Sequence, residues 1–230
     1  MFGFRYYDSS MLLLLPTLIL SLYAQFRVSV AFATGKNILN SRGLTGLDVA
    51  RSLLDSAGLY QVRVESVSSG DHFDPRANVV RLTPGVLQGR DVTALAVAAH
   101  EVGHAVQHQQ NYAPLGFRTA FFPVARIGSS MAWPLLLVGF MFEWSTLVTL
   151  GILLFTAAVL FQVVTLPIEF DASRRAVDML TGGGYIVASE EPHIRNVLNA
   201  AALTYIAATL TALAQLLRLL MISNSRRSRK

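Results

Sequence analysis

The sequence has no cysteine among its 230 residues, and this absence removes several kinds of chemistry at once. Disulfide bonds, thiolate zinc clusters and cysteine nucleophiles are all excluded. A metal site in this chain would therefore have to use histidine and carboxylate ligands.

Charge is also scarce, because Asp, Glu, Lys and Arg make up only 14% of the chain whereas hydrophobic residues make up 53%. The charges largely avoid four long apolar stretches, which predicts a multi-pass membrane protein. The formal net charge of +5 arises from Lys and Arg residues that are scattered singly. Because no basic face is interleaved with aromatic residues, we expect no nucleic-acid partner.

The hydropathy pattern divides the chain into six segments. We expect a transmembrane anchor over residues 1–26, an aqueous domain over 27–122 and a transmembrane helical hairpin over 123–168. A helix and loop over 169–196, a transmembrane helix over 197–222 and a basic tail over 223–230 should follow. A cleaved signal peptide is the alternative for the first segment, but Leu22-Tyr23-Ala24 is a poor cleavage site. The tail, with Arg226, Arg227, Arg229 and Lys230, either contacts anionic headgroups or is simply solvated.

The aqueous segment is predicted to hold two helices and two short strands. Thr45 is a typical N-cap for a helix over Gly46–Ser56, and Asp91 for a longer helix over about Val92–Gln109. Alternation of apolar and polar residues predicts strands at Gln61–Ser66 and Asn78–Leu82, separated by turns.

The longer predicted helix contains His100-Glu101-Val102-Gly103-His104, an H-E-x-x-H pattern. Residues four apart on a helix lie on one face about 5–6 Å apart, so both imidazoles can bind one zinc ion. Glu101 lies beside that face and is placed to act as a base. Chance would produce the pattern in about three in a thousand sequences of this composition. The alternative is a pair of surface histidines beside a solvated carboxylate.

The third ligand must come from elsewhere, because residues 107 and 110 are both Gln and the extended H-E-x-x-H-x-x-G-x-x-H form is absent. Glu169 is the best candidate, since two apolar spans precede it and return the chain to the side of the motif. Two histidines, one carboxylate and an open position form a common catalytic zinc arrangement. Weaker candidates are Asp171, Asp178, Glu190 and His193. Glu169 could instead cap its helix or pair with Arg174 or Arg175.

These residues predict a zinc metalloendopeptidase with one catalytic Zn²⁺ and Glu101 as the general base. His193 and Tyr205 are candidates for a second oxyanion donor. An edge strand at Asn78, Val79, Val80 and Arg81 is predicted to receive an extended substrate, with an ordinary core strand as the alternative.

Five segments together are more specific than the H-E-x-x-H pattern alone. They are residues 41–46 (SRGLTG), 71–76 (DHFDPR), 94–104 (ALAVAAHEVGH), 166–176 (LPIEFDASRRA) and 198–205 (LNAAALTY). In them the chain resembles the neutral zinc metallopeptidases of bacterial inner membranes, which are distantly similar to the membrane heat-shock and CAAX-processing zinc proteases. The resemblance implies a zincin-like, gluzincin-type catalytic domain with His100, His104 and Glu169 as ligands and Glu101 as the catalytic residue.

The chain departs from the distant relatives at one position. Where they read E-x-x-A-D, this sequence has Glu169, Ala172 and then Ser173. Because zinc-bound imidazoles usually need a hydrogen-bonding partner, we expect Asp171 or Asp178 to orient a ligand histidine instead.

We therefore predict a mainly α protein with a small β-sheet and four transmembrane helices in the bacterial cell (inner) membrane. Its active site is expected at the membrane surface, in contact with the lipid bilayer. Its substrates are expected to be proteins or peptides, with membrane proteins among the candidates. The side of the membrane stays open, because basic residues flank the spans on both sides. The alternative function is a non-catalytic zinc-binding membrane scaffold. An intramembrane protease is disfavoured, because the motif helix has only about 15 apolar-leaning residues.

Overall fold

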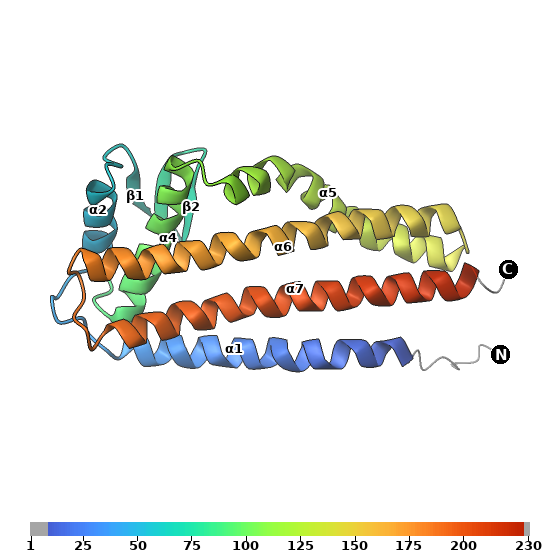
Figure 1. Cartoon of the computed structure of the whole chain (residues 1–230), viewed down its shortest axis with the longest axis horizontal. Coiled ribbons are helices and arrows are strands. Elements are labelled where there is room, and N and C mark those ends of the chain that lie inside the picture. Colours follow the sequence, from blue (N-terminus) through green and yellow to red (C-terminus); the bar gives the residue numbers. More distant parts are fainter. Residues whose placement is uncertain (1–8, 228–230) are drawn as a thin grey trace. The chain divides into compact units, whose positions relative to one another are not determined.

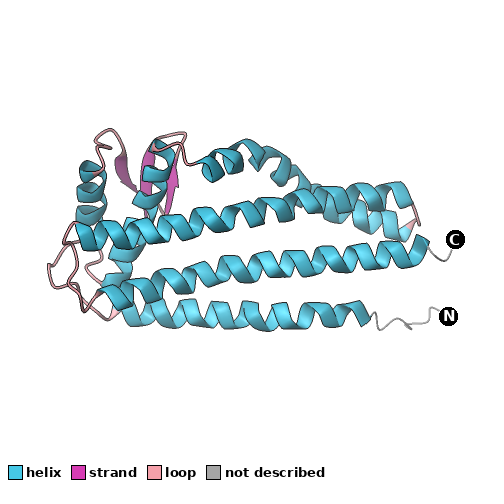
Figure 2. Cartoon of the chain, in the orientation of Figure 1, coloured by secondary structure: helices cyan, strands magenta, loops and turns pink. Residues whose placement is uncertain are grey.

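The computed structural model describes residues 9–227, and the side chains of Arg226 and Arg227 lie outside the description. The first eight residues of the predicted anchor and residues 228–230 of the predicted basic tail therefore fall outside the described residues. Figure 1 shows the elements in chain order, and Figure 2 shows that the strands form one small sheet in an otherwise helical chain. The predicted fold class, mainly α with a small sheet, is confirmed.

The described residues form two compact units. Unit 1 comprises residues 9–24, 117–165 and 205–227, and unit 2 comprises residues 25–116 and 166–204. The long helices α1 (Leu15–Lys36), α6 (Ser145–Gly182) and α7 (Glu191–Arg227) each contribute residues to both units, and a short 3₁₀ helix, Ser9–Leu14, precedes α1.

Unit 1 contains most of α5 (Ala113–Met141) and the first part of α6. These two helices form the predicted hairpin, with Glu143 in its tight turn at a positive φ of 53°. Within residues 9–227, four helices are long and apolar enough to cross a membrane, namely Ser10–Lys36, Ala113–Met141, Ser145–Gly182 and Glu191–Ser225. The prediction of a multi-pass membrane protein is therefore confirmed.

Unit 2 contains α2 (Gly46–Ser56), α3 (Pro84–Leu87), α4 (Val92–Gln109) and the sheet. Both N-caps predicted from the sequence are present. Thr45 and Asp48 form a reciprocal capping box at α2, and the Asp91 carboxylate accepts from the Ala94 amide at 3.0 Å at α4. Helix α4 packs against α2, α3 and the sheet. Its apolar face, which includes Leu95, lies in the main core together with Leu53 and Leu54 of α2.

The sheet contains β1 (Arg63–Ser66), β2 (His72–Asp74) and β3 (Val79–Leu82) in the order β1-β3-β2. Strand β3 pairs in parallel with β1 and antiparallel with β2, so both of its edges are occupied. The prediction that Asn78, Val79, Val80 and Arg81 form a substrate-binding edge strand is therefore wrong. The physical reason is that β2, a three-residue strand in a region predicted to contain only turns, pairs with the edge of β3 that was expected to be open.

The segment that carries Glu169 is also organised differently from the prediction. The sequence predicts a helix and loop over residues 169–196 as a segment that follows the hairpin, but α6 continues from the second arm of the hairpin without a break as far as Gly182. Pro167 lies inside this helix and does not end it. Glu169 is therefore carried by the same helix that forms the hairpin.

Candidate metal centre

Helix α4 positions the two motif histidines one turn apart on the same face. Their ring centroids are 4.7 Å apart and the rings meet edge to face at 82°. Both side chains are largely buried, with exposures of 16% for His100 and 13% for His104. The helical spacing therefore brings the two imidazoles together as the motif predicts.

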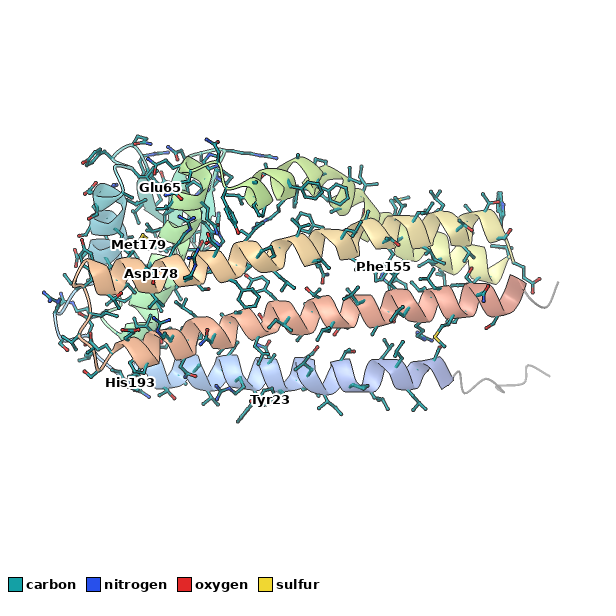
Figure 3. All side chains as sticks on the ribbon, viewed as in Figure 1. Tyr23, Glu65, Phe155, Asp178, Met179 and His193 are labelled. Atoms are coloured by element: carbon teal, nitrogen blue, oxygen red, sulfur yellow. The ribbon has the colours of Figure 1, made fainter. Side chains whose placement is uncertain are left out.

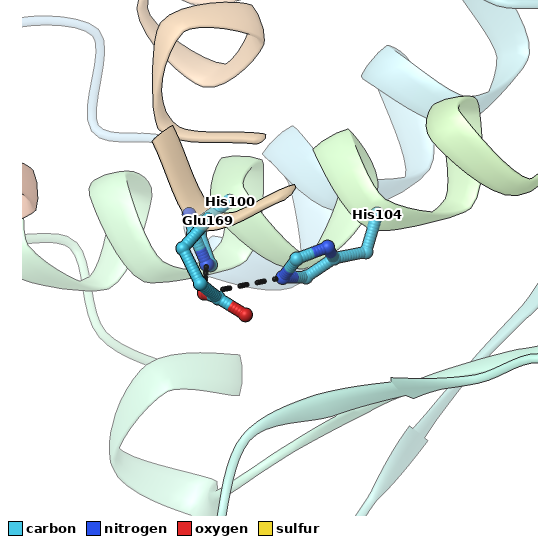
Figure 4. A group of neighbouring side chains, drawn as sticks. All are labelled: His100, His104 and Glu169. Carbon is cyan, nitrogen blue, oxygen red and sulfur yellow. Dashed lines mark ion pairs between the residues drawn. The ribbon is translucent and has the colours of Figure 1, made fainter. Parts of the chain in front are cut away.

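Glu169 reaches this pair from α6, as Figure 4 shows. Its Oε2 atom lies 3.3 Å from Nε2 of His100 and 3.7 Å from Nε2 of His104. The three side chains offer ligand atoms that all lie within 4.8 Å of one another. The structure thus brings the three predicted ligand residues together.

Gly103, in the middle of the motif, sets the approach of α4 to α6. A Cβ atom added to it would lie 2.7 Å from the carbonyl oxygen of Ala172 and 3.2 Å from its Cα, closer than such contacts normally allow. Ala172 is itself fully buried. Only glycine at this position lets the two backbones come close enough to place Glu169 beside the imidazoles.

The alternative in which Glu169 pairs with Arg174 or Arg175 is not what the structure shows. Both guanidinium groups instead bind the carboxylate of Asp171, which is 8% exposed. Arg175 also donates to the Gln110 side chain at 2.7 Å. Glu169 therefore faces the imidazoles, whereas Asp171 binds Arg174 and Arg175.

The Nδ1 atoms of the two histidines contact different partners. His100 Nδ1 lies 3.2 Å from the Ser173 hydroxyl, so Ser173 occupies the position where the distant relatives carry aspartate. His104 Nδ1 lies 3.0 Å from Oε1 of Gln107, whose Nε2 donates to Asp171 at 2.9 Å. Asp171 therefore contacts a ligand histidine only through Gln107. The role of Gln107 could not be predicted from the sequence, because no local pattern links it to a residue on α6.

Glu101 is buried, with 7% of its surface exposed. Its Oε2 atom accepts a hydrogen bond from the backbone amide of Phe73 at 3.0 Å. Phe73 lies in β2, an edge strand that packs against α4. The strand that the prediction missed therefore holds the carboxylate predicted to be catalytic.

The electrostatic environment of the site favours a cation. Burial by itself lowers the pKa of His104, but the hydrogen bond to Glu169 and the charges of Glu101 and Glu169 outweigh it, so the pKa is raised. Two carboxylates beside two imidazoles therefore attract positive charge, which a divalent metal ion supplies as well as a proton does. Two imidazole nitrogens and one carboxylate oxygen are also the ligand types of catalytic zinc sites, so these residues fit a zinc ion.

The other nominated residues have different partners or positions. Among the described residues, the metal-ligand cluster includes neither Asp171, Asp178, Glu190 nor His193. Asp178 is exposed on α6 and His193 lies in the first turn of α7 (Figure 3). Glu190 accepts from the Ser41 hydroxyl at 2.6 Å. Tyr205 belongs to unit 1, and its role as an oxyanion donor stays a prediction, as does that of His193.

Similarity to known proteins identifies the family of the chain. The family model described as "Putative neutral zinc metallopeptidase" matches residues 10–224. The chain is 48% identical over 206 residues to "Putative membrane protease YugP" of Bacillus subtilis (strain 168). The aligned region covers 88% of this chain and 91% of that protein. No solved structure matches the chain. Because the family match extends over almost the whole chain, the protein belongs to this family of neutral zinc metallopeptidases.

Proposed function

We propose that the chain is a membrane-bound zinc endopeptidase in which His100, His104 and Glu169 hold the metal and Glu101 is the general base. One observation carries the proposal, namely that the three ligand atoms lie within 4.8 Å of one another while a buried carboxylate stands next to His100 in the sequence. A structural zinc site closes its fourth position and needs no such base.

Zinc in this site would lower the pKa of a bound water molecule to near 7 and polarise the carbonyl of the scissile peptide bond. The protein supplies the proton transfers. The Phe73 amide, which donates to Oε2 of Glu101, holds the carboxylate that takes the proton from the attacking water. The same carboxylate then returns the proton to the leaving amine, so Glu101 acts first as a base and then as an acid.

The site is proposed to work at the membrane surface. Among the described residues, α4 is not one of the helices that are long and apolar enough to cross a membrane. Its ends carry Asp91 as the N-cap and the exposed residues 108–110, which favour water. The substrates would accordingly be peptide segments that are accessible from the aqueous side, in proteins or in peptides.

The test measures cleavage of a dye-labelled denatured protein by the detergent-solubilised, zinc-loaded chain. Glu101→Gln should bind as much zinc as the wild type but cleave about 10²–10⁴-fold more slowly, since general acid–base catalysis contributes that much. Glu143→Gln, the same substitution in the exposed hairpin turn, is the matched control and should cleave at the wild-type rate. Equal rates for wild type and Glu101→Gln would instead favour a non-catalytic zinc-binding scaffold.

A further inference from the structure

Gln107 is a buried polar side chain that connects the two helices carrying the predicted ligands. It lies one turn after His104 on α4, and its side chain is fully buried. Its Oε1 is 3.0 Å from His104 Nδ1, while its Nε2 donates to the Ile168 carbonyl at 2.8 Å and to Asp171 at 2.9 Å. Ile168 and Asp171 flank Glu169 on α6. The Gln107 side-chain amide therefore contacts one ligand imidazole and also residues before and after Glu169 on α6.

The hydrogen-bonding roles in this group can be assigned without ambiguity. A backbone carbonyl and a carboxylate only accept, so the Gln107 NH₂ group must face Ile168 and Asp171, and Oε1 must face His104. Because Oε1 only accepts, His104 Nδ1 must carry a hydrogen. In a neutral imidazole the lone pair is then on Nε2, the nitrogen that faces Glu169.

Asp171 is itself fixed, because two guanidinium groups bind its carboxylate. Arg175 is held further by the side chain of Gln110, and it lies 5.9 Å from the centre of the Tyr112 ring. The contacts from the two arginines to His104 are therefore continuous, and Gln107 is the residue that bridges the helices.

The partner of His100 is of a different kind. Its Nδ1 faces the Ser173 hydroxyl, which can either donate or accept a hydrogen bond. This contact does not select a tautomer of His100. The two histidines of the motif are thus oriented unequally, and His104 is the constrained one.

We propose that Gln107, anchored by Asp171, is a positioning residue that fixes the tautomer and ring orientation of His104 for metal binding and ties it to the helix that carries Glu169. The inference rests on the proposed function only in taking His104 as a zinc ligand. Partners of ligand histidines typically change metal affinity by about 10- to 100-fold when they are removed.

The experiment measures zinc affinity by chelator competition and the visible spectrum of the Co²⁺-substituted full chain in detergent. Gln107→Met, which keeps the side-chain length and removes the polar atoms, should weaken zinc binding about 10- to 100-fold and shift the Co²⁺ bands. Gln109→Met, the same change at an exposed position of α4, is the matched control and should change neither. Ser173→Ala should weaken binding by less than Gln107→Met does.

A rescue variant separates positioning from packing. In Gln107→Glu combined with Asp171→Asn, residue 107 can still accept from His104 and now also accepts from residue 171, but the Ile168 carbonyl loses its donor. This double variant should therefore bind zinc more tightly than Gln107→Met and restore part of the Co²⁺ spectrum. The thermal midpoint of the metal-free chain, followed by circular dichroism, tells whether each variant is folded.

Two results would overturn the proposal: zinc affinity of folded Gln107→Met within twofold of wild type, or a double variant that binds no better than Gln107→Met. Both readouts are independent of proteolysis. If wild type and Glu101→Gln cleave equally, the proposed function fails while the zinc affinities still test the role of Gln107. His104→Ala, which should weaken zinc binding more than Gln107→Met, confirms that the measured metal is at this site.

Discussion

The two units of the chain place their apolar side chains in opposite ways. In unit 2 the large apolar residues, such as Leu53, Leu54 and Leu95, are inside and 0–2% exposed. In unit 1, Ile19, Leu137 and Leu153 are exposed, whereas Leu136, Val148 and Ile152 pack in a small core. The first arrangement suits water and the second suits hydrocarbon. One chain therefore carries two surfaces that are each stable in only one solvent.

Glycine residues let helices pack closely in both units, but the contacts have different consequences. In unit 1 a Cβ on Gly128 would lie 2.5 Å from the Leu154 carbonyl oxygen, and one on Gly139 would lie 2.8 Å from the Val148 nitrogen. Small residues at helix contacts are typical in lipid, where burial of apolar surface gives no driving force. In unit 2 the contact of Gly103 with Ala172 determines where a predicted metal ligand lies. The same device holds helices together in one unit and sets site geometry in the other.

The largest effect is expected from Gly103→Ala. The added methyl group must push α6 away from α4, so zinc affinity should fall about 100-fold, at the upper end of the range for residues that orient ligands. The free energy of unfolding should fall by about 1–3 kcal/mol from overpacking. Both are measured in detergent, by chelator competition and by denaturant titration. Gly116→Ala, where nothing lies within 4 Å of the added atom, is the control. Wild-type zinc affinity in folded Gly103→Ala would show that this contact does not set the site.

The difference in solvent is tested with one substitution at two exposed leucines. Leu153 in unit 1 is 62% exposed and Leu39 in unit 2 is 74% exposed. Leu153→Arg should cost about 3 kcal/mol of membrane insertion, since a charged residue in the middle of a span costs that much. Leu39→Arg should change stability by less than about 0.5 kcal/mol, as is usual at a water-exposed position. The fraction of chain that resists alkaline extraction from membranes is the measurement, and equal extraction of both variants would contradict the assignment.

Gly128→Ala tests whether the glycine contacts differ in role. Its Cβ would meet the Leu154 carbonyl, so the free energy of unfolding should fall by about 1–3 kcal/mol. Zinc affinity of the folded chain should stay within threefold of wild type, in contrast to Gly103→Ala. A loss of zinc affinity as large as that of Gly103→Ala would mean that packing in unit 1 also determines the site.

The smallest effect concerns Glu190, whose carboxylate joins two loops of unit 2. Burial by itself raises the pKa of Glu190, but hydrogen bonds from Ser41 and from the Val187 amide outweigh it, so the pKa is lowered. A lowered pKa in the folded state contributes stability that is present above the ordinary value of 4.5 and is lost as pH falls through the folded value. Glu190→Gln should therefore be less stable than wild type at pH 7, by about 1 kcal/mol. Thermal midpoints should converge as the pH falls below 4.5, and a constant difference would exclude this linkage.

Much of unit 2 could be predicted from the sequence because its signals are local. The bounds of α2 and α4 follow from Thr45 and Asp91 and from the periodicity of the residues behind them. The spacing of His100 and His104 fixed their mutual placement, and the count of spans correctly placed Glu169 beside them.

The errors concern contacts between residues that are distant in the sequence. Strand β2 has only three residues, and it exists because it pairs with β3 and donates to Glu101. The parallel pairing of β1 with β3 leaves no hairpin loop from which the register could be read. The link from Gln107 to Asp171 joins two residues that are 64 positions apart in the chain and lie on different helices. Local composition cannot reveal such pairings, because they depend on how the helices pack.

The separation of the ligands along the chain has a consequence for biosynthesis. A nascent polypeptide that has left the ribosome only as far as His104 carries both imidazoles but no Glu169. The carboxylate arrives on α6, after both arms of the apolar hairpin have been translated. The proposed set of three ligands can therefore be completed only after the hairpin has been made.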